Sequence, residues 1–313
     1  MFIVSVVIIT YLPRSQNKIL SYFSSQSINP FSLVLVSLGK RRVEAMVISC
    51  QSITSKISIK KAAYRLKPLE KIINEKRIIN EEQWQLLQTI SFYYFFPLSS
   101  LLKYVLLSSK ILQLVKINTN RNNKKLVKKE NAKPLVLFGD DFMLIKEQVK
   151  KTLKKNQQIL FIFPNQIKLE YYFNNLTEWQ KEIFVANKKN SKKFLKDYQA
   201  INNNEIKIIF GKRSVPFLPF NNLGLIILVD ESNIGHKTLE TKIHYDAKKV
   251  AFFLQKIWLA QLIIVNQTLS IETVFSLAAN NYQNLNKFID PLPNNKKFSI
   301  ENNPFRQDNI FNA

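Results

Sequence analysis

Chemistry on nucleotides would require a glycine-rich phosphate loop, and the glycines of this chain are too far apart to form one. Such a loop, G-x-x-x-x-G-K-[ST], cradles phosphates with its backbone N–H groups and reaches them with its lysine. The two nearest glycines, Gly224 and Gly235, stand 11 positions apart. The loop therefore occurs nowhere in the sequence, and a conventional NTPase is not expected.

Side chains that often hold metals or act as nucleophiles are scarce. Cys50 is the single cysteine, and His236 and His244 are the two histidines. One cysteine can form neither a disulfide framework within the chain nor a cysteine-based zinc cluster. The histidines stand near Asp246, but no nucleophile pattern accompanies them. We expect core or surface histidines, no metal, no cofactor and no catalytic residue.

One short segment concentrates basic side chains. Gly39-Lys40-Arg41-Arg42 joins two β-rich runs, Ser32–Leu38 and Val43–Ser49. Two such runs with a short glycine-containing link predict a hairpin. Lys40, Arg41 and Arg42 would then lie at its tip, where phosphates can reach them. A solvated tip without a ligand is the alternative interpretation.

The net charge also favours a polyanionic partner. The chain carries 46 Lys and Arg against 22 Asp and Glu, a formal charge of +24. Residues 1–133 hold 22 of the basic residues and 6 of the acidic ones, whereas residues 134–313 hold 24 and 16. A basic front half is typical of nucleic-acid binding. Lysines outnumber arginines 38 to 8, so AT-rich coding contributes to the total, but it does not explain the asymmetry.

Hydrophobic spacing predicts the elements that position these residues. In the first half, Phe2–Ile9 is a further strand, and helical spacing covers residues 81–115. The aromatic run Tyr93–Phe96 predicts a core-facing helix end, and a base-stacking stripe is the alternative. Neither the apolar start nor residues 92–115 fits a signal peptide or an uncharged span of about 20 residues. We expect a cytoplasmic protein without membrane contact.

The second half alternates strands with helices. Phe142–Leu153 has the spacing of an amphipathic helix. Buried strands interleaved with helices predict a mostly parallel, doubly wound sheet. Polar residues 118–133 resemble a solvated linker. The strand-like runs are residues 134–138, 159–163, 206–210, 225–229 and 262–265.

Short motifs of the second half follow one another in an order that resembles a known family. They are Asn204-Glu205, Gly211–Ser214, Pro219–Gly224 and Tyr245–Ala251. The order resembles the first motor lobe of the primosomal protein N′ (PriA-type) family of replication-restart helicases. The first half resembles the family's N-terminal domain, which grips a DNA 3′ end, through residues 12–14, 38–41, 66–67 and 93–98.

The resemblance implies a DNA 3′-end pocket. In the family this pocket uses an aromatic-acidic pair, a hairpin glycine and the lysine of an L-K motif. Gly39 and Lys67 keep the last two positions, while Gln16 and Asn17 replace the pair. Asn17 can still hydrogen-bond a base edge. DNA contacts are thus expected from Asn17, Gly39 and Lys67 together with the hairpin tip; an ordinary exposed lysine is the alternative for Lys67.

The same resemblance implies a degenerate nucleotide site. Where the family has its phosphate loop, this sequence has Gly139-Asp140-Asp141, a shorter loop whose two carboxylates would repel a triphosphate. Aligned on Asn222-Leu223-Gly224, the family's D-E-x-H step reads Val229-Asp230-Glu231-Ser232. That alignment puts a valine at the magnesium-binding position. A slip of one residue puts Asp230 and Glu231 there instead.

The sequence and the resemblance together predict an organisation and a function. We expect an α+β, β-rich DNA-binding domain with helices at residues 1–115, a basic linker at 116–133, one RecA-like α/β motor lobe at 134–290 and a tail at 291–313. The family's winged-helix domain and second motor lobe have no counterpart in the sequence, so a truncated, non-enzymatic member is expected. It would bind forks, 3′ ends or single strands of DNA in replication restart, with other restart proteins as partners. A protein-interaction scaffold and an active ATP-dependent 3′–5′ helicase are the alternatives.

Overall fold

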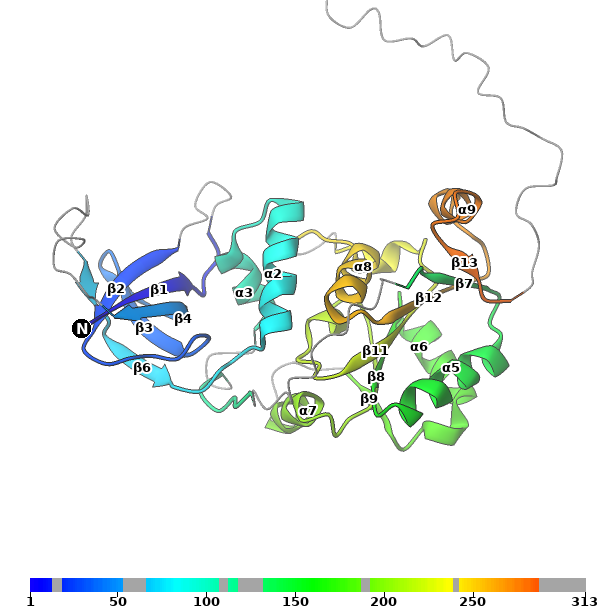
Figure 1. Cartoon of the computed structure of the whole chain (residues 1–313), viewed down its shortest axis with the longest axis horizontal. Coiled ribbons are helices and arrows are strands. Elements are labelled where there is room, and N and C mark those ends of the chain that lie inside the picture. Colours follow the sequence, from blue (N-terminus) through cyan, green and yellow to red (C-terminus); the bar gives the residue numbers. More distant parts are fainter. Residues whose placement is uncertain are drawn as a thin grey trace, which may run out of the picture.

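The computed structural model describes most of the chain as two β-sheets with helices between and around them (Figure 1). It describes residues 1–12, 19–52, 66–106, 112–117, 132–186, 192–238 and 242–286. Asn17 and the greater part of the predicted linker and tail lie outside these ranges. Among the described residues, no helix combines the length and the apolar character that a membrane crossing needs.

The first sheet contains six strands in the order β5-β2-β1-β4-β3-β6. The two edge strands follow one another in the chain, and the residues between them form hydrogen bonds to two different strands of the sheet. The Leu69 N–H donates to the Phe23 carbonyl at 2.9 Å, and the Glu70 N–H donates to the Leu35 carbonyl at 3.1 Å. The sheet therefore closes into a small barrel, which leaves no long unpaired edge. The strands are β1 (Phe2–Ile8), β2 (Leu20–Ser24), β3 (Leu33–Leu38), β4 (Arg41–Ser52), β5 (Lys67–Pro68) and β6 (Lys71–Asn74).

The interior of the barrel is apolar and β-branched. Val4, Val6, Val34 and Val36 are fully buried there. Such side chains pack well on a pleated surface. Tyr22 crosses the interior, and its hydroxyl donates to the Ser37 carbonyl at 2.7 Å.

Two helices follow the barrel: α2 (Glu81–Tyr94) and α3 (Leu98–Val105). Helix α2 begins with a capping box, in which the Asn80 side chain accepts from the Gln83 N–H and the Gln83 side chain accepts from the Asn80 N–H. It ends at Phe95, whose φ of 55° is left-handed. Pro97 then starts α3.

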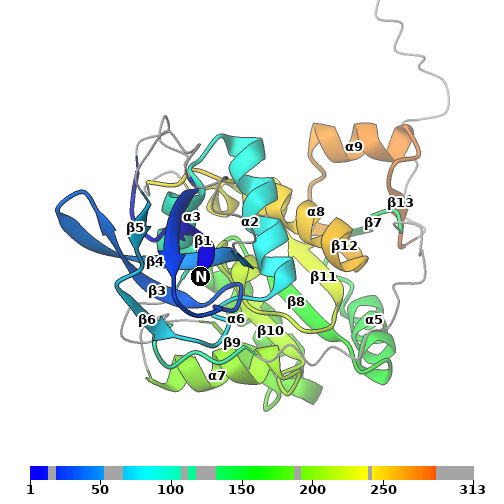
Figure 2. The ribbon, with the colours of Figure 1, turned by 60° about the vertical axis from the view of Figure 1, so that its left-hand side comes forward.

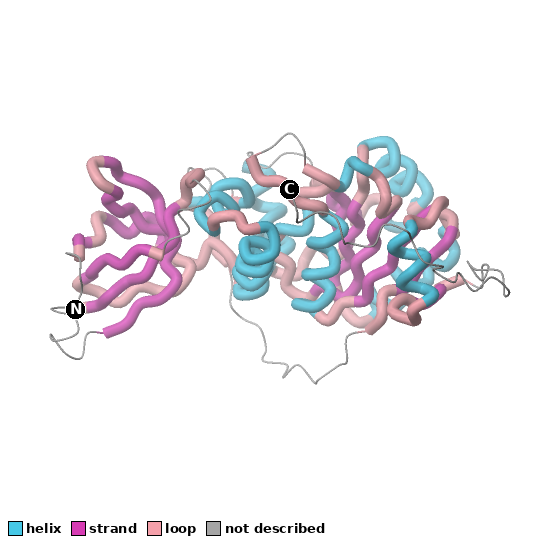
Figure 3. The backbone as a smooth tube through the Cα atoms, turned by 90° about the horizontal axis from the view of Figure 1, so that it is seen from above, coloured by secondary structure: helices cyan, strands magenta, loops and turns pink. Residues whose placement is uncertain are grey.

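Helix α2 packs against both sheets. On one side the Trp84 ring lies 5.9 Å from the Phe31 ring of the barrel. On the other side the Gln83 Nε2 donates to the Phe217 carbonyl at 2.8 Å. Figures 1 and 3 both show α2 between the two sheets. One continuous hydrophobic core therefore joins the barrel, the helices and one face of the second sheet.

The second sheet has seven strands, and every neighbouring pair is parallel. Their order is β13-β7-β12-β11-β8-β10-β9. Buried residues of α5 and α6 cover one face, and those of α7 and α8 cover the other. The strands are β7 (Leu135–Phe138), β8 (Gln158–Ile162), β9 (Ile183–Val185), β10 (Ile208–Gly211), β11 (Leu223–Val229), β12 (Gln261–Asn266) and β13 (Gln283–Asn284). The helices are α5 (Phe142–Lys154), α6 (Gln166–Asn175), α7 (Lys192–Asn202), α8 (Ala247–Trp258) and α9 (Ile271–Ala278), with short 3-10 turns at Thr177–Trp179, Val215–Phe217 and Ile234–His236.

The predicted fold class is confirmed: an α+β, β-rich part precedes an α/β part with a parallel sheet. The division into four segments stays a prediction. Helix α2 and the second sheet share a core, so the contact between the two halves is extensive.

Candidate nucleic-acid interface and nucleotide site

The basic hairpin has the predicted form. Leu38 pairs with Arg41, so Gly39 and Lys40 form a two-residue turn between β3 and β4. Gly39 has a φ of +60°, which glycine adopts without strain. Gly39, Lys40, Arg41 and Arg42 are all exposed. In Figure 2 the hairpin projects from the rest of the barrel.

The three cations of the hairpin differ in their surroundings. The Arg42 Nε lies 2.7 Å from the Glu70 Oε2, which ties the hairpin to the start of β6. Within the part of the chain that the structure describes, Lys40 and Arg41 form no ion pair. Lys40 and Arg41 are therefore the better candidates for phosphate contacts.

Lys67 lies at the same end of the barrel as the hairpin tip. It is exposed and pairs with Tyr22 in the parallel pair of β5 and β2. Strand β6 runs antiparallel to β3, with Leu35 opposite Lys71. Extending this antiparallel register by four residues, back from the start of the strand, puts Lys67 level with Gly39. Strand β1 ends and β2 begins at this end as well. Asn17, between those two strands in sequence, lies outside the described residues.

A very short turn joins β7 to α5 at the expected phosphate-loop position. It consists of Gly139, with a φ of +81°, followed by Asp140 and Asp141. Asp141 caps α5: its Oδ1 accepts from the N–H groups of Met143 and Leu144, each at 3.1 Å. A helix N-terminus attracts anions through such N–H groups. Here a carboxylate of the chain already occupies them.

Asp140 is held among neighbouring side chains. The Tyr172 hydroxyl donates to its Oδ1 at 2.5 Å, and the Gln267 Nε2 donates to its Oδ2 at 2.9 Å. The Lys168 Nζ lies 3.7 Å from Oδ2. Burial, and then the hydrogen bond to Asp140, raise the pKa of Tyr172 well above its ordinary value. The Asp140 carboxylate thus binds α6 and the loop after β12, and its charge is compensated within the protein.

The second acidic pair lies at the end of β11. The register of β11 against β8 shifts between Leu223 and Leu225, so the strand contains one extra residue at Gly224. Val229 is then buried in the sheet core. Asp230 is the first residue beyond β11, and its N–H donates to the Val265 carbonyl.

Glu231 lies at the centre of a buried polar cluster. Its side chain has no exposed surface and pairs with the Lys248 ammonium of α8. The hydroxyls of Ser270 and Thr273 donate to its Oε1 at 2.5 and 2.6 Å. Burial alone would raise the pKa of Glu231, but the hydrogen bonds from Lys248, Ser270 and Thr273 outweigh it and lower that pKa. Glu231 is therefore a bound carboxylate that links β11, α8 and α9.

The aromatic run is divided between core and surface. Phe96 is buried and Tyr94 half-buried, whereas Phe95 is exposed. His236 is buried, with its Nε2 2.9 Å from the Val229 carbonyl. Burial lowers the pKa of His236. His244 is exposed. In the described ranges, no group of three or more His, Cys, Asp or Glu side chains is arranged to hold a metal ion.

The sequence did not indicate which side chains would contact these residues. Glu70 beside Arg42, Tyr172 beside Asp140 and Lys248 beside Glu231 are far from their partners along the chain or carry no motif. Only Lys248 stood inside a matching motif, Tyr245–Ala251. An N-cap aspartate before an apolar-periodic helix was the one cue to the role of Asp141.

Comparison with known proteins gives a matching family model for about the first third of the chain and relatives for most of it. Residues 7–107 match the family of the PriA 3′DNA-binding domain (3′BD). A replication restart protein PriA of Rickettsia prowazekii is 25% identical over 251 residues, which are 71% of this chain and 37% of that protein. The PriA of Rickettsia felis is 24% identical over 87% of this chain and 44% of its own. That of Borreliella burgdorferi is 28% identical over 56% of this chain and 28% of its own.

A solved structure, the DUF1998 helicase MrfA bound to DNA, aligns with 44% of this chain and 19% of its own at 12% identity and a TM-score of 0.31. That score is too low to bear on the fold. The matches to PriA proteins span less than half of those relatives' length. The chain is a distant relative of the PriA-type replication restart proteins, as the motifs of the sequence predict.

Proposed function

We propose that this PriA relative is a non-catalytic DNA-binding protein of replication restart, which binds forks or 3′ ends of DNA. One observation carries the proposal. The barrel that matches the 3′DNA-binding domain family gathers exposed Gly39, Lys40, Arg41 and Lys67 at one end, while an internal carboxylate caps the helix at which a phosphate would bind.

The end of the barrel suits a nucleic-acid backbone. Lys40 and Arg41 lie on a projecting two-residue turn, where phosphates are accessible from several directions. Phosphate contacts of this kind provide affinity and position without sequence readout. Lys67, level with Gly39, would add a contact specific to a strand end. Asn17 remains part of this proposed pocket on the sequence argument.

The turn at Gly139–Asp141 argues against nucleotide hydrolysis. A triphosphate would have to displace the Asp141 carboxylate from the N–H groups of α5. The same three-residue turn offers it no cation, because its other polar side chain is the carboxylate of Asp140. Lys168, the cation nearest to Asp140 among the described ion pairs, is already matched with it. We infer that Gly139, Asp140, Asp141, Asp230 and Glu231 form the relic of a nucleotide site.

The test is a DNA-binding titration of the full chain with forked, 3′-tailed and 5′-tailed duplexes, run beside an ATPase assay. We expect tighter binding to forks and 3′ tails, and no DNA-stimulated hydrolysis. Equal, weak binding to all three would contradict the proposed end recognition. Hydrolysis that is lost in Asp230→Ala would contradict the non-catalytic assignment.

Two alternatives each have an observation in their favour. The extra residue at Gly224 brings Asp230 and Glu231 to the end of β11, as an active helicase would require, and the ATPase assay tests this. Exposed Met143, Ile167 and Ile271, near the N-termini of α5, α6 and α9, favour a protein-interaction scaffold. If the protein is a scaffold, the wild type should bind purified restart proteins, and Met143→Ser should bind them less tightly. We place the protein in the cytoplasm, with DNA and restart proteins as partners.

A further inference from the structure

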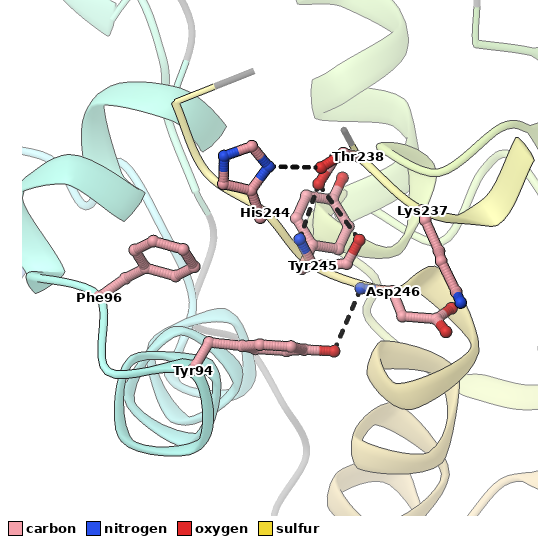
Figure 4. A pocket seen from close by; sticks show the side chains of 7 residues that line it. All are labelled: Tyr94, Phe96, Lys237, Thr238, His244, Tyr245 and Asp246. Carbon is pink, nitrogen blue, oxygen red and sulfur yellow. Dashed lines mark hydrogen bonds between the residues drawn. The ribbon is translucent and has the colours of Figure 1, made fainter. Parts of the chain in front are cut away.

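A cavity of 360 Å³ lies between the corner that joins α2 to α3 and the segment that precedes α8. Tyr94 and Phe96 line it from the corner between α2 and α3, and Lys237, His244 and Asp246 line it from the segment that leads into α8. Figure 4 shows these side chains on opposite sides of the space. Its volume falls within the range of about 300–1,000 Å³ that is usual for ligand sites.

Hydrogen bonds within the protein hold the walls of the cavity. The Asp246 N–H donates to the Tyr94 hydroxyl at 3.1 Å. The His244 Nδ1 donates to the Thr238 carbonyl at 2.9 Å, which fixes the orientation of the ring. The Thr238 hydroxyl in turn contacts the backbone of Ile243 and Tyr245. The aromatic walls are therefore positioned before any ligand arrives.

A second cavity of 190 Å³ adjoins the first and shares Phe96 and His244 with it. Tyr11, Ser100 and Lys242 are among its other lining residues. The Lys242 ammonium lies 4.6 Å from the centre of the Tyr11 ring. Because the two cavities share this aromatic ring and this imidazole in their linings, we refer to them together as the crevice.

The crevice leads away from the end of the barrel that carries the hairpin tip. Tyr11 and Leu12 follow three and four residues after Ile8, the last residue of β1, which ends on that side. The Leu12 N–H donates to the Ser100 hydroxyl of α3 at 3.0 Å, which anchors this connection beside the crevice. A strand of DNA that contacts the barrel end can thus continue into the crevice.

We propose that the crevice binds a nucleobase, stacked between the aromatic rings and His244, with its neighbouring phosphates near Lys237 and Lys242. This proposal rests on the proposed function for the source of the base. Aromatic side chains such as Tyr94 and Phe96 suit every base, since each base has a π-face. The His244 imidazole and the Asp246 carboxylate lie at the edge of the cavity, and the Asp246 Oδ1 also accepts from the Lys248 N–H at the start of α8. Two flanking ammonium groups suit an anionic backbone better than an apolar peptide.

The test uses the full chain and short single strands that carry one 2-aminopurine, whose fluorescence falls on stacking. We expect quenching by the wild type, and loss of that quenching in His244→Ala. In a series of strands with one abasic residue at successive positions, affinity should fall about five- to tenfold at one or two positions only. This decrease corresponds to the lower part of the range for base–aromatic stacking. Lys242→Gln should weaken binding while the quenching at saturation is kept.

Phe92→Ala is the matched control, because Phe92 is an 82% exposed aromatic residue on α2 that does not line the crevice. It should behave as the wild type. The deoxyribonucleoside monophosphate of 2-aminopurine forms the second arm. If the protein quenches the fluorescence of the strand but not that of the monophosphate, the crevice binds a base within DNA. If it quenches both equally, the crevice binds a free nucleotide. Either result supports a base site.

Two results would overturn the proposal: no quenching in either arm, or quenching that His244→Ala leaves unchanged. The proposed function fails separately. If Arg41→Ala and Lys67→Ala leave DNA affinity unchanged while His244→Ala abolishes quenching, the base site stands and the barrel interface does not.

Discussion

At the scale of single residues, the cations of the hairpin tip are not equivalent. Arg42 is tied to Glu70, whereas Lys40 and Arg41 extend into solvent on the turn. An exposed ion pair of this kind contributes about 0–1 kcal/mol to stability. Its main effect here is to hold the hairpin against the start of β6.

Arg41→Ala should weaken binding to linear and circular single strands alike, because a phosphate contact carries no information about strand ends. The slope of log K against log salt should become shallower by about 0.7, the value for one phosphate contact with a single strand. Fluorescence anisotropy over a salt series measures both. An unchanged slope would mean that Arg41 makes no phosphate contact.

Lys67→Ala should weaken binding to linear strands more than to closed circles, because only an end can enter a pocket beside Gly39. In the wild type, a 3′-hydroxyl should be preferred to a 3′-phosphate by about 1 kcal/mol, comparable to one net hydrogen bond. Competition between the two oligonucleotides measures this preference. Equal affinity for circles and linear strands in both proteins would show that no end pocket exists.

Asp141→Ala should destabilise the protein by about 0.5–2 kcal/mol, because α5 loses its N-cap. It should not create ATPase activity, since the phosphate loop is still lacking. Urea denaturation measures the loss of stability. Asp141→Asn is the matched control: it keeps the acceptor oxygen and should lose much less. An equal loss in Asp141→Asn and Asp141→Ala would assign the effect to charge rather than to the cap.

At the scale of elements, the Glu231 cluster joins one strand to two helices. Lys248 belongs to α8, and Ser270 and Thr273 stand at the start of α9. The side chains that could have served metal binding and proton transfer are thus used to hold elements together.

Glu231→Gln should cost about 3 kcal/mol at neutral pH, because Lys248 is left without its buried partner. The folded-state pKa of Glu231 lies below its unfolded value, so its contribution is present above about pH 4.3 and is lost as the pH falls through the lower, folded-state pKa. The difference between wild type and variant should therefore shrink in acid. Urea denaturation at neutral pH and near pH 3 measures it.

Glu147→Gln is the control for this comparison, because Glu147 pairs with Lys151 on the exposed surface of α5. It should change stability little at either pH. A Glu231→Gln difference that stays constant in acid would mean that the carboxylate is not the charged partner of Lys248.

At the scale of the whole molecule, α2 makes the two halves one structural unit. Gln83 is buried, and its Nε2 also donates to the Tyr198 hydroxyl of α7 at 3.2 Å. Asn80 donates to the Phe220 carbonyl at 2.8 Å. Helix α2 also packs along α8. A fragment containing only the barrel and α2 would expose this surface, so DNA affinity is best located with point variants of the full chain.

Gln83→Ala should lower stability by about 1–3 kcal/mol, because the buried Phe217 carbonyl loses its donor. Unfolding should remain a single transition, observed alike by tryptophan fluorescence and far-ultraviolet circular dichroism. Gln85→Ala, on the exposed side of the same helix, should have little effect. Two separate transitions in the wild type would contradict the shared core.

The sequence by itself determined the elements with strong local signals. Alternating and helical periodicity predicted β1, β3, β4, α5 and the central parallel strands, and the hairpin followed from a glycine between two β-rich runs. The lack of a phosphate loop is a property of glycine spacing and needs no structure. The weak strands β2, β5, β6, β9 and β13 were not predicted, because they are short or lack a clear alternation.

Only the tertiary structure decided how these parts meet. Closure of the barrel depends on Leu69 and Glu70 bonding to two different strands, and the position of Asp230 depends on one extra residue in β11. The roles of Asp140, Asp141 and Glu231 depend on partners from distant segments of the chain or on the start of a helix. Local periodicity carries no information about contacts between residues far apart in sequence. Those contacts arise when apolar faces pack together, and they give these acidic residues their partners.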